Sequence, residues 1–192
     1  QFLSVQINTN GHYSLHNHAV ASSLRRQDIQ IQLCGDGASA NLCGAAMAPQ
    51  RGNLDQQVTM EHLSANTTSQ QTFHNIVADR GKSTFNGRIH IHAGARNSNA
   101  NLSNKNIGLG ANATINTKPE LEIYNDDVSC SHGATIGQLD NDQLFYLCSR
   151  GVDPNAARQL LCEGFLQQCV GGPLADSATA GLLEPLQGLS IQ

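Results

Sequence analysis

The chain has 192 residues, of which 39% are hydrophobic and 14% charged, and this composition is typical of a folded domain and excludes a disordered chain or a coiled coil. Its formal net charge of −4 provides no basic surface, so nucleic acid and an anionic membrane are not expected as partners. No apolar run approaches the ~20 residues of a membrane helix. Because the chain lacks an initiator Met and a recognisable leader, we expect it to be a piece of a longer protein, truncated at its N-terminal side.

Short segments of β-strand character follow one another from residue 29 to about residue 137. Several alternate apolar and polar residues, as in Arg88–His92, where the isoleucines face one way and the histidines the other. No helical periodicity interrupts them, which disfavours crossover helices and a βαβ sheet and leaves a sandwich, a barrel or a β-helix. Abundant Asn and Gly suit corners that bend through left-handed backbone conformations. The expected strands are Ile29–Cys34, Ala40–Cys43, Gln57–Leu63, Gln71–Val77, Thr84–His92, Ala100–Leu109, Ala113–Ile115, Leu121–Tyr124 and Val128–Cys130.

The character of the sequence changes after residue 139, where helical signals begin. Asp140 is placed to cap one helix, which Gly151 ends, and Asp153 is placed to cap a second, with Pro154 at its first position. The second helix is expected to stop at Gly171–Pro173, and the leucines of residues 174–192 indicate one more helix, interrupted by a proline. The predicted units are therefore residues 1–139 and residues 140–192.

Six cysteines are scattered along the chain instead of forming a dense framework of disulfides. We interpret them as reduced thiols and expect a cytoplasmic protein. They are Cys34, Cys43, Cys130, Cys148, Cys162 and Cys169.

Cys130 and His132 are the first candidates for metal ligands. They lie two residues apart near the end of an expected strand, so their side chains share one face. Thiolate and imidazole are ligands that iron and iron–sulfur clusters accept. Gly133, which follows, is expected to allow a close approach or a sharp turn. A short Cys-x-His sequence is a weak signal, and a small buried cysteine is the alternative.

His90 and His92 form a second pair on one strand face, but they are short of the three or four ligands of a zinc site. An exposed polar strand face is therefore the favoured interpretation, and His16 and His18 pose the same question. The acidic residues Glu120, Glu122, Asp126 and Asp127 fit turns and solvated positions better than calcium binding. No ATPase or hydrolase motif is present, so no catalytic activity is expected.

The segment Thr117–Asp140 (TKPELEIYNDDVSCSHGATIGQLD) and the following Leu144–Gly151 (LFYLCSRG) resemble the SufB/SufD family of iron–sulfur cluster assembly scaffolds, and its SufD members in particular. The resemblance implies a right-handed parallel β-helix core, followed by a small C-terminal helical segment. It also implies that His132, with Cys130 beside it, lies at the interface with a SufB-like paralogue, where a transient, shared iron–sulfur cluster forms. Gly133 replaces a Glu of SufB, and Asn104 occupies the place of its essential Cys. The chain therefore resembles the half that completes a shared site.

The same resemblance implies that the C-terminal helices dock on a SufC-like ATPase of the ABC class. The matching residues are Phe145, Tyr146, Arg150, Arg158 and Phe165. An alternative is that Phe145 and Phe165 cover the end of the β-helix. When isolated, the chain is expected to be able to form a homodimer.

Two other functions remain open at this stage. One is a purely structural β-helix module for dimerisation, in which loss of His132 has no effect. The other is a β-helix enzyme acting on polysaccharide, which the absence of Trp and the 4% aromatic content disfavour, since sugars stack on aromatic rings.

Overall fold

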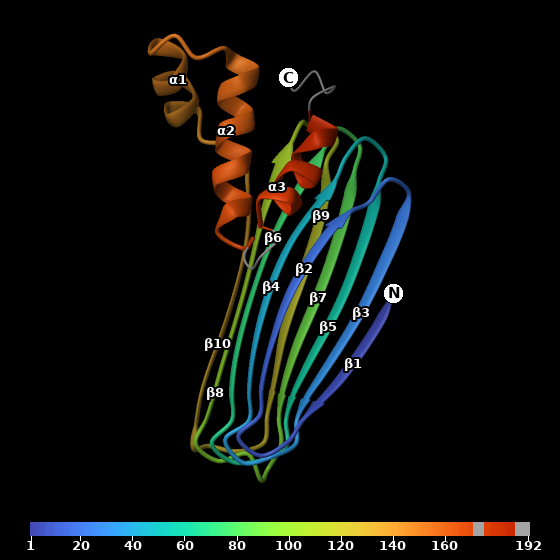
Figure 1. Ribbon diagram of the computed structural model, residues 1–192, viewed down its shortest axis with the longest axis vertical. Helices are drawn as coiled ribbons and strands as arrows, with labels where there is room; N and C mark the ends of the chain where they lie inside the picture. Colours follow the sequence, from blue (N-terminus) through green and yellow to red (C-terminus); the bar gives the residue numbers. More distant parts are fainter. Residues whose placement is uncertain (171–174, 187–192) are drawn as a thin grey trace.

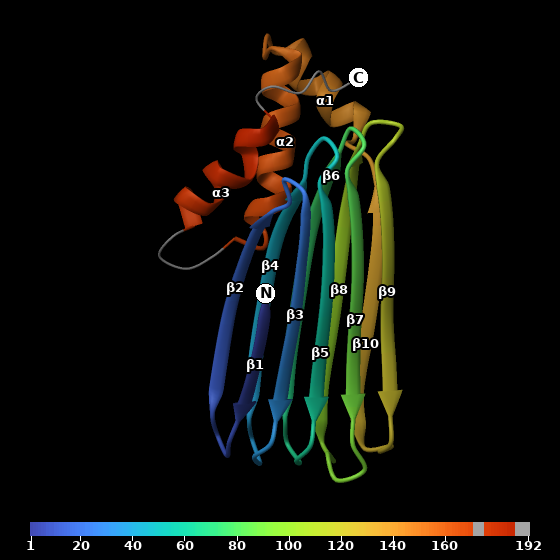
Figure 2. The same cartoon turned by 90° about the vertical axis from the view of Figure 1, so that its right-hand side faces the viewer.

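Two parallel five-stranded sheets dominate the structure (Figures 1 and 2), a computed structural model that describes residues 1–170 and 175–186. The odd-numbered strands form one sheet in the order β1-β3-β5-β7-β9, and the even-numbered strands form the other in the order β10-β8-β6-β4-β2. The strands are β1 Phe2–Ile7, β2 His12–Val20, β3 Leu24–Leu33, β4 Ser39–Ala48, β5 Asn53–His62, β6 Thr68–Ala78, β7 Lys82–Ile91, β8 Ser98–Leu109, β9 Thr114–Ile123 and β10 Val128–Gly137.

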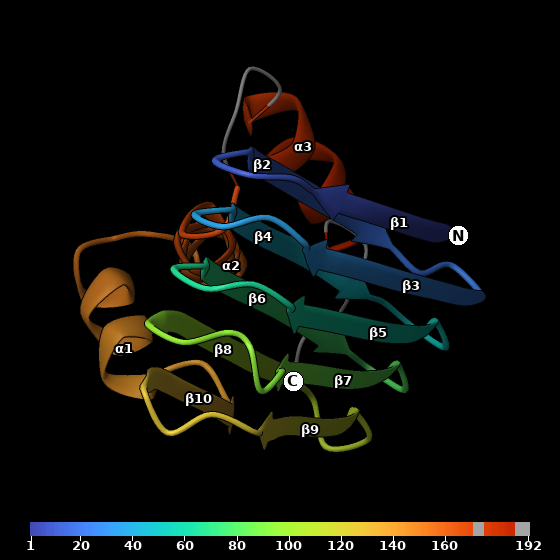
Figure 3. The ribbon, with the colours of Figure 1, turned by 90° about the horizontal axis from the view of Figure 1, so that it is seen from below.

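Consecutive strands alternate between the two sheets, so the chain winds as a coil that adds one strand to each sheet per turn (Figure 3). Side-chain hydrogen bonds join neighbouring coils, for example between residues 29, 30 or 31 positions apart. The parallel β-helix expected from the resemblance is confirmed, because every strand pairing is parallel and links successive coils.

Left-handed residues mark the corners, as the Asn and Gly content predicted. Asn10, Gly37, Asn66 and Asn97 have positive φ at successive turns of the coil. They also hold the turns together, since the Asn97 amide donates to Asn66 Oδ1 at 2.6 Å and the Asn66 amide donates to Asp36 Oδ1 at 2.8 Å. Asn tolerates the left-handed conformation and bonds to neighbouring groups, so it is well suited to this position.

Inward-facing residues of the two sheets form the main core. Ile31, Met60 and Ile89 occupy adjacent strands in register and are completely buried. Burying a side chain of this size stabilises the fold by roughly 1.5–3 kcal/mol. From the sheets on either side, Phe73 and Phe85 meet with ring centroids 5.0 Å apart. The space between the two sheets is therefore filled by packed side chains.

Three helices follow the β-helix: α1 Asn141–Ser149, α2 Pro154–Gln167 and α3 Ala175–Leu183, with the short 3-10 helix η1 Glu184–Leu186. The predicted caps are confirmed: Asp140 Oδ1 accepts from the backbone of Asp142 and Gln143, and Asp153 caps α2 in the same way. Gly151 has a φ of +86° after α1. The predicted stop at 171–173 lies outside the described residues.

Helices α2 and α3 pack on the outer face of the even-numbered sheet, near the carboxyl ends of its strands (Figures 1 and 3). Both faces of β4 and β6 are buried there, and Cys162 and Leu166 of α2 join Met47 and Ile76 in a second apolar cluster. Among the described residues, α1 buries none of its side chains and is held mainly through α2. Helix α1 therefore projects from the body of the molecule.

Several predicted strand boundaries are wrong. The expected segments Ala113–Ile115 and Leu121–Tyr124 belong to one strand, β9, whose Pro119 is tolerated because β9 is an edge strand. Strand β10 continues to Gly137, so Cys130 and His132 lie within it and not at its end. The expected strands in the second and third coils are also too short, and β1 and β2, which form the first coil, were not predicted.

The expected role of Gly133 is wrong as well. This residue lies in the middle of β10, and a Cβ added there would meet nothing within 4 Å. It provides neither a sharp turn nor a close backbone approach.

Within residues 1–170 and 175–186, no helix combines the length and the apolar character that crossing a membrane requires.

Candidate functional site

The last coil leaves one end of the β-helix open. Strands β9 and β10 are terminal members of their sheets, so within residues 1–170 and 175–186 no further coil covers their inward-facing rows (Figure 3). Ile123 on β9 and Ile136 on β10 continue rows that are buried in the coils beneath, yet they are 45% and 56% exposed. The surface at the open end is therefore formed by inward-facing residues of β9 and β10, whose equivalents in the preceding coils are buried.

Cys130 and His132 lie in the inward row of β10. Cys130 pairs with Ala100 of β8 and packs against the core, whereas His132 pairs with the buried Leu102 but is itself exposed. The two side chains share one face, as predicted from their spacing. His132 therefore presents an accessible imidazole at the open end, with a thiol deeper in the same row.

Cys130 is less available than His132 as a metal ligand in the isolated chain. Partial burial raises the pKa of its thiol, and a backbone hydrogen bond from Ala100 offsets this only in part. Because the thiolate is the form that binds metal, a raised pKa disfavours binding at neutral pH. The geometry favours His132 as the accessible ligand.

Asn104 is completely buried in the row next to His132. Its Oδ1 accepts from Thr117 Oγ1 at 2.8 Å and from Asn106 Nδ2 at 2.7 Å. A side chain with these bonds ties the last two coils together. It offers no thiolate, so the open end contains no second soft ligand at this position.

The backbone edges of the open end differ between the two sheets. Strand β9 carries Pro119, which has no N–H to donate, and Lys118, whose charge discourages strand pairing. Strand β10, with the sequence VSCSHGATIG, carries neither a proline nor a formally charged residue. It is a ten-residue edge without these protections, which suits pairing with a strand from another chain.

Helix α1 exposes the aromatic residues that the sequence singled out. Phe145 is 74% and Tyr146 56% exposed, and the guanidinium of Arg150 lies 5.0 Å from the Tyr146 ring centroid. Such an exposed aromatic and Arg group is typical of a binding surface. Phe145 does not cover the end of the β-helix, because most of its side chain faces solvent.

Phe165 and Arg158 on α2 are placed differently. The Phe165 ring stacks on His74 at 4.5 Å between centroids, and His74 Nδ1 donates to the Phe165 carbonyl oxygen at 2.7 Å. Phe165 thus attaches α2 to the outer face of β6. Arg158 is half-buried and donates to Asn155 Oδ1 at 3.4 Å within the same helix.

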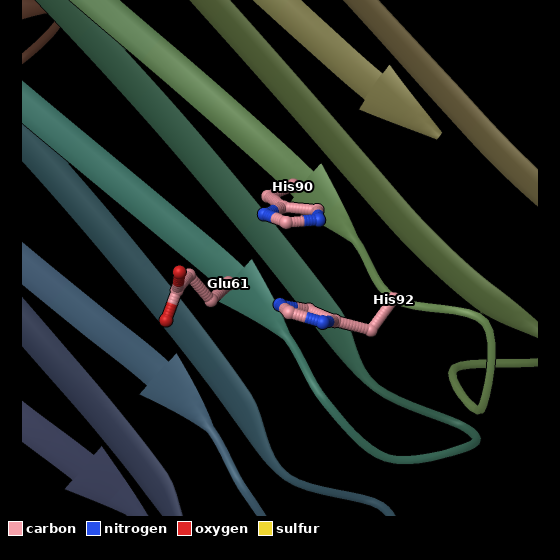
Figure 4. A group of neighbouring side chains, drawn as sticks. All are labelled: Glu61, His90 and His92. Carbon is pink, nitrogen blue, oxygen red and sulfur yellow. The ribbon is translucent and has the colours of Figure 1, made fainter. Parts of the chain in front are cut away.

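A group of possible metal ligands forms at the opposite end of the molecule from the helices (Figures 2 and 4). Glu61 at the end of β5 joins His90 and His92, and one potential ligand atom of each lies within 4.8 Å of the others. The sequence revealed the histidines but missed Glu61, which is 29 residues before His90 and beside it in register. The register between coils was the signal needed to find it.

All six cysteines are free thiols in the structure. Burial raises the pKa of Cys162 and Cys169 to about 12; Cys162 lies on α2 and Cys169 just after it, and both belong to the second apolar cluster. These two cysteines contribute to packing, and their thiols are not accessible as nucleophiles.

Comparison with known proteins identifies the family. Residues 3–165 match the family model described as "SUF system FeS cluster assembly, SufBD core domain". The chain is 35% identical over 150 residues to the iron-sulfur cluster assembly protein SufD of Escherichia coli K12, which covers 78% of this chain and 36% of that protein. It is 33% identical over 153 residues to the SufBD family protein slr0076 of Synechocystis, covering 80% and 34% of the two chains.

A protein named SufB also matches the chain. Identity to the iron-sulfur cluster assembly protein SufB of Bacillus subtilis is 31% over 148 residues, covering 77% of this chain and 32% of that protein. The chain spans about a third of the length of these curated relatives. It belongs to the SufB/SufD family of iron–sulfur cluster assembly proteins and is SufD-like.

Proposed function

We propose that this protein is a non-catalytic scaffold subunit for iron–sulfur cluster assembly in a SufB–SufC–SufD type complex in the cytoplasm. The observation that carries the proposal is the position of His132, an exposed imidazole in an inward-facing row at the open end of the β-helix. A partner that covers this end would enclose His132 in the shared interface. Imidazole is an established alternative to thiolate on iron.

A SufB-like paralogue is the partner proposed for the open end. Strand β10 offers a free parallel edge, and a second β-helix that pairs with it would extend the even-numbered sheet across the two subunits. Because Asn104 supplies no thiolate here, the principal thiolate of the nascent cluster would come from that partner. His132 completes the site from this side, and Cys130 lies behind it.

The exposed surface of α1 is proposed to dock a SufC-like ATPase of the ABC class. Phe145, Tyr146 and Arg150 project away from the β-helix, where a second protein can reach them. Arg158 and Phe165 are proposed to extend this surface along α2. Since α2 is fixed to β6 through His74, movement of the helices in response to ATP would be transmitted to the β-helix.

Iron and sulfide content of the complex tests the proposal. The full-length protein is purified anaerobically with its SufB-like and SufC-like partners, as wild type, His132→Ala and the control Ser129→Ala. Ser129 lies on the same strand, but its side chain points to the other face. We expect His132→Ala to lose most of the cluster from an intact complex, whereas Ser129→Ala retains it.

Unchanged iron and sulfide in an intact His132→Ala complex would contradict the proposal. That result favours the alternative, in which the chain is a structural module for β-helix dimerisation.

A further inference from the structure

Glu61, His90 and His92 form a cluster of two imidazoles and one carboxylate on the outer face of the odd-numbered sheet (Figure 4). Glu61 is the second-last residue of β5, His90 is the second-last residue of β7, and His92 follows two residues later on the same face. Their potential ligand atoms lie within 4.8 Å of one another. Small side-chain rotations would bring all three to the roughly 2 Å that a first-row metal ion requires.

The two histidine rings lie side by side. The rings of His90 and His92 stack with centroids 3.9 Å apart and planes at 16°. The Nε2 atom of His92 is buried and has no hydrogen-bond partner in the structure. A buried ring nitrogen without a hydrogen-bond partner makes folding less favourable, and coordination to a metal would offset this cost.

Neighbouring strands position the ligands. Gln32 on β3 donates to Glu61 Oε2 at 2.6 Å, and Gln6 on β1 donates to Gln32 Oε1 at 2.9 Å, so the carboxylate is held from the side. On the other side, Glu122 Oε2 of β9 lies 3.8 Å from His90 Nδ1. Glutamine and carboxylate groups of this kind orient metal ligands in proteins and fix the tautomer of a histidine.

We propose that Glu61, His90 and His92 bind a divalent first-row transition-metal ion, such as Zn²⁺ or Fe²⁺, with water in the remaining positions. Two imidazoles and one carboxylate are the ligand set that such ions prefer, whereas Ca²⁺ and Mg²⁺ select oxygen ligands.

This site is separate from the one proposed for cluster assembly. The triad lies on the outer face of the odd-numbered sheet, and His132 lies in an inward row of the even-numbered sheet. Its variants should therefore leave His132 and the open end unchanged, and each proposal can fail without the other.

Titration with Co²⁺ and Zn²⁺ tests the site in the full-length protein. Co²⁺ should bind with one-to-one stoichiometry at this site, giving visible d–d bands without the near-ultraviolet charge-transfer band of a cobalt thiolate, and Zn²⁺ should displace it. Loss of an outer-shell partner alone typically costs 10–100-fold in metal affinity, so His92→Ala and Glu61→Gln should each weaken Zn²⁺ binding at least tenfold.

His16→Ala is the matched control, because His16 and His18 form another His-x-His pair on a strand, without a third ligand in a group of this kind among the described residues. It should leave Co²⁺ and Zn²⁺ affinity unchanged. Glu61→Gln preserves the shape of the side chain, so its circular dichroism and melting temperature without metal should match the wild type. Absence of one-to-one binding, a thiolate band, or equal weakening by His16→Ala would overturn the proposal.

Discussion

His62 shows how a single side chain is adapted to the interior of the β-helix. It is completely buried, its Nδ1 lies 2.8 Å from Thr67 Oγ1, and its Nε2 lies 2.8 Å from Ser69 Oγ. Both ring nitrogens therefore have hydroxyl partners, which can donate or accept as a neutral imidazole requires. Burial lowers the pKa of His62 to about 4.

This lowered pKa predicts that the protein loses stability as the pH falls from about 6.5 towards 4. In that range the unfolded chain binds a proton at His62 that the folded protein does not accept, so the free energy of unfolding decreases by up to about 3 kcal/mol. Urea denaturation at several pH values should show a steeper decline for the wild type than for His62→Gln. Other histidines with lowered pKa values contribute to both proteins. Parallel pH dependences would contradict this role of His62.

Residue-scale prediction from the sequence succeeded where the signal was local. Asp140 and Asp153 were identified as helix caps because a capping side chain bonds to backbone groups only two or three residues away. The shared face of Cys130 and His132 also followed from spacing alone. Glu61 was missed, because its neighbours His90 and His92 lie on the next coil of the same sheet, and only the register between coils brings them together.

At the scale of single elements, β10 is the strand that decides how the molecule can associate. Gly133 offers a direct test, because its Cβ position faces open space and a substitution there leaves the fold of the single chain intact. Gly133→Lys places a charge along the free edge, a device by which natural proteins prevent strand pairing. We expect it to weaken binding to the SufB-like partner at least tenfold, as measured by analytical ultracentrifugation.

Gly133→Ala is the control for this experiment, since it adds a side chain without a charge. It should bind the partner with nearly the affinity of the wild type. If Gly133→Lys binds equally well, the partner does not pair with β10, and the interface must lie elsewhere.

The strands were predicted less well than the helices for a physical reason. Ala45–Ala48 and Ile76–Ala78 are buried on both faces, by the core on one side and by α2 and α3 on the other, so they show no alternation of apolar and polar residues. In β9 a proline divided the pattern in two, although an edge strand accommodates it. The pattern therefore indicated strands but not their ends.

At the scale of the whole molecule, the choice of a parallel β-helix depended on the resemblance to a family. The coil has no fixed sequence repeat, because only a row of inward-facing residues and a left-handed corner recur from one turn to the next. Asn10, Gly37, Asn66 and Asn97 mark those corners, but their spacing varies from one turn to the next. Alternation of residues alone could not distinguish this arrangement from a sandwich.

The open end of the β-helix gives the molecule its proposed function, because it exposes an interior row that only a partner would cover. The central claim is that the His132 imidazole binds the nascent cluster there. Pulsed electron paramagnetic resonance of the reduced cluster in the anaerobic complex tests it directly, using the wild type and His132→Cys, which replaces the imidazole with another ligand. We predict nitrogen hyperfine coupling from a coordinated imidazole in the wild type and its loss from a retained cluster in His132→Cys. The same coupling in both complexes would contradict the account.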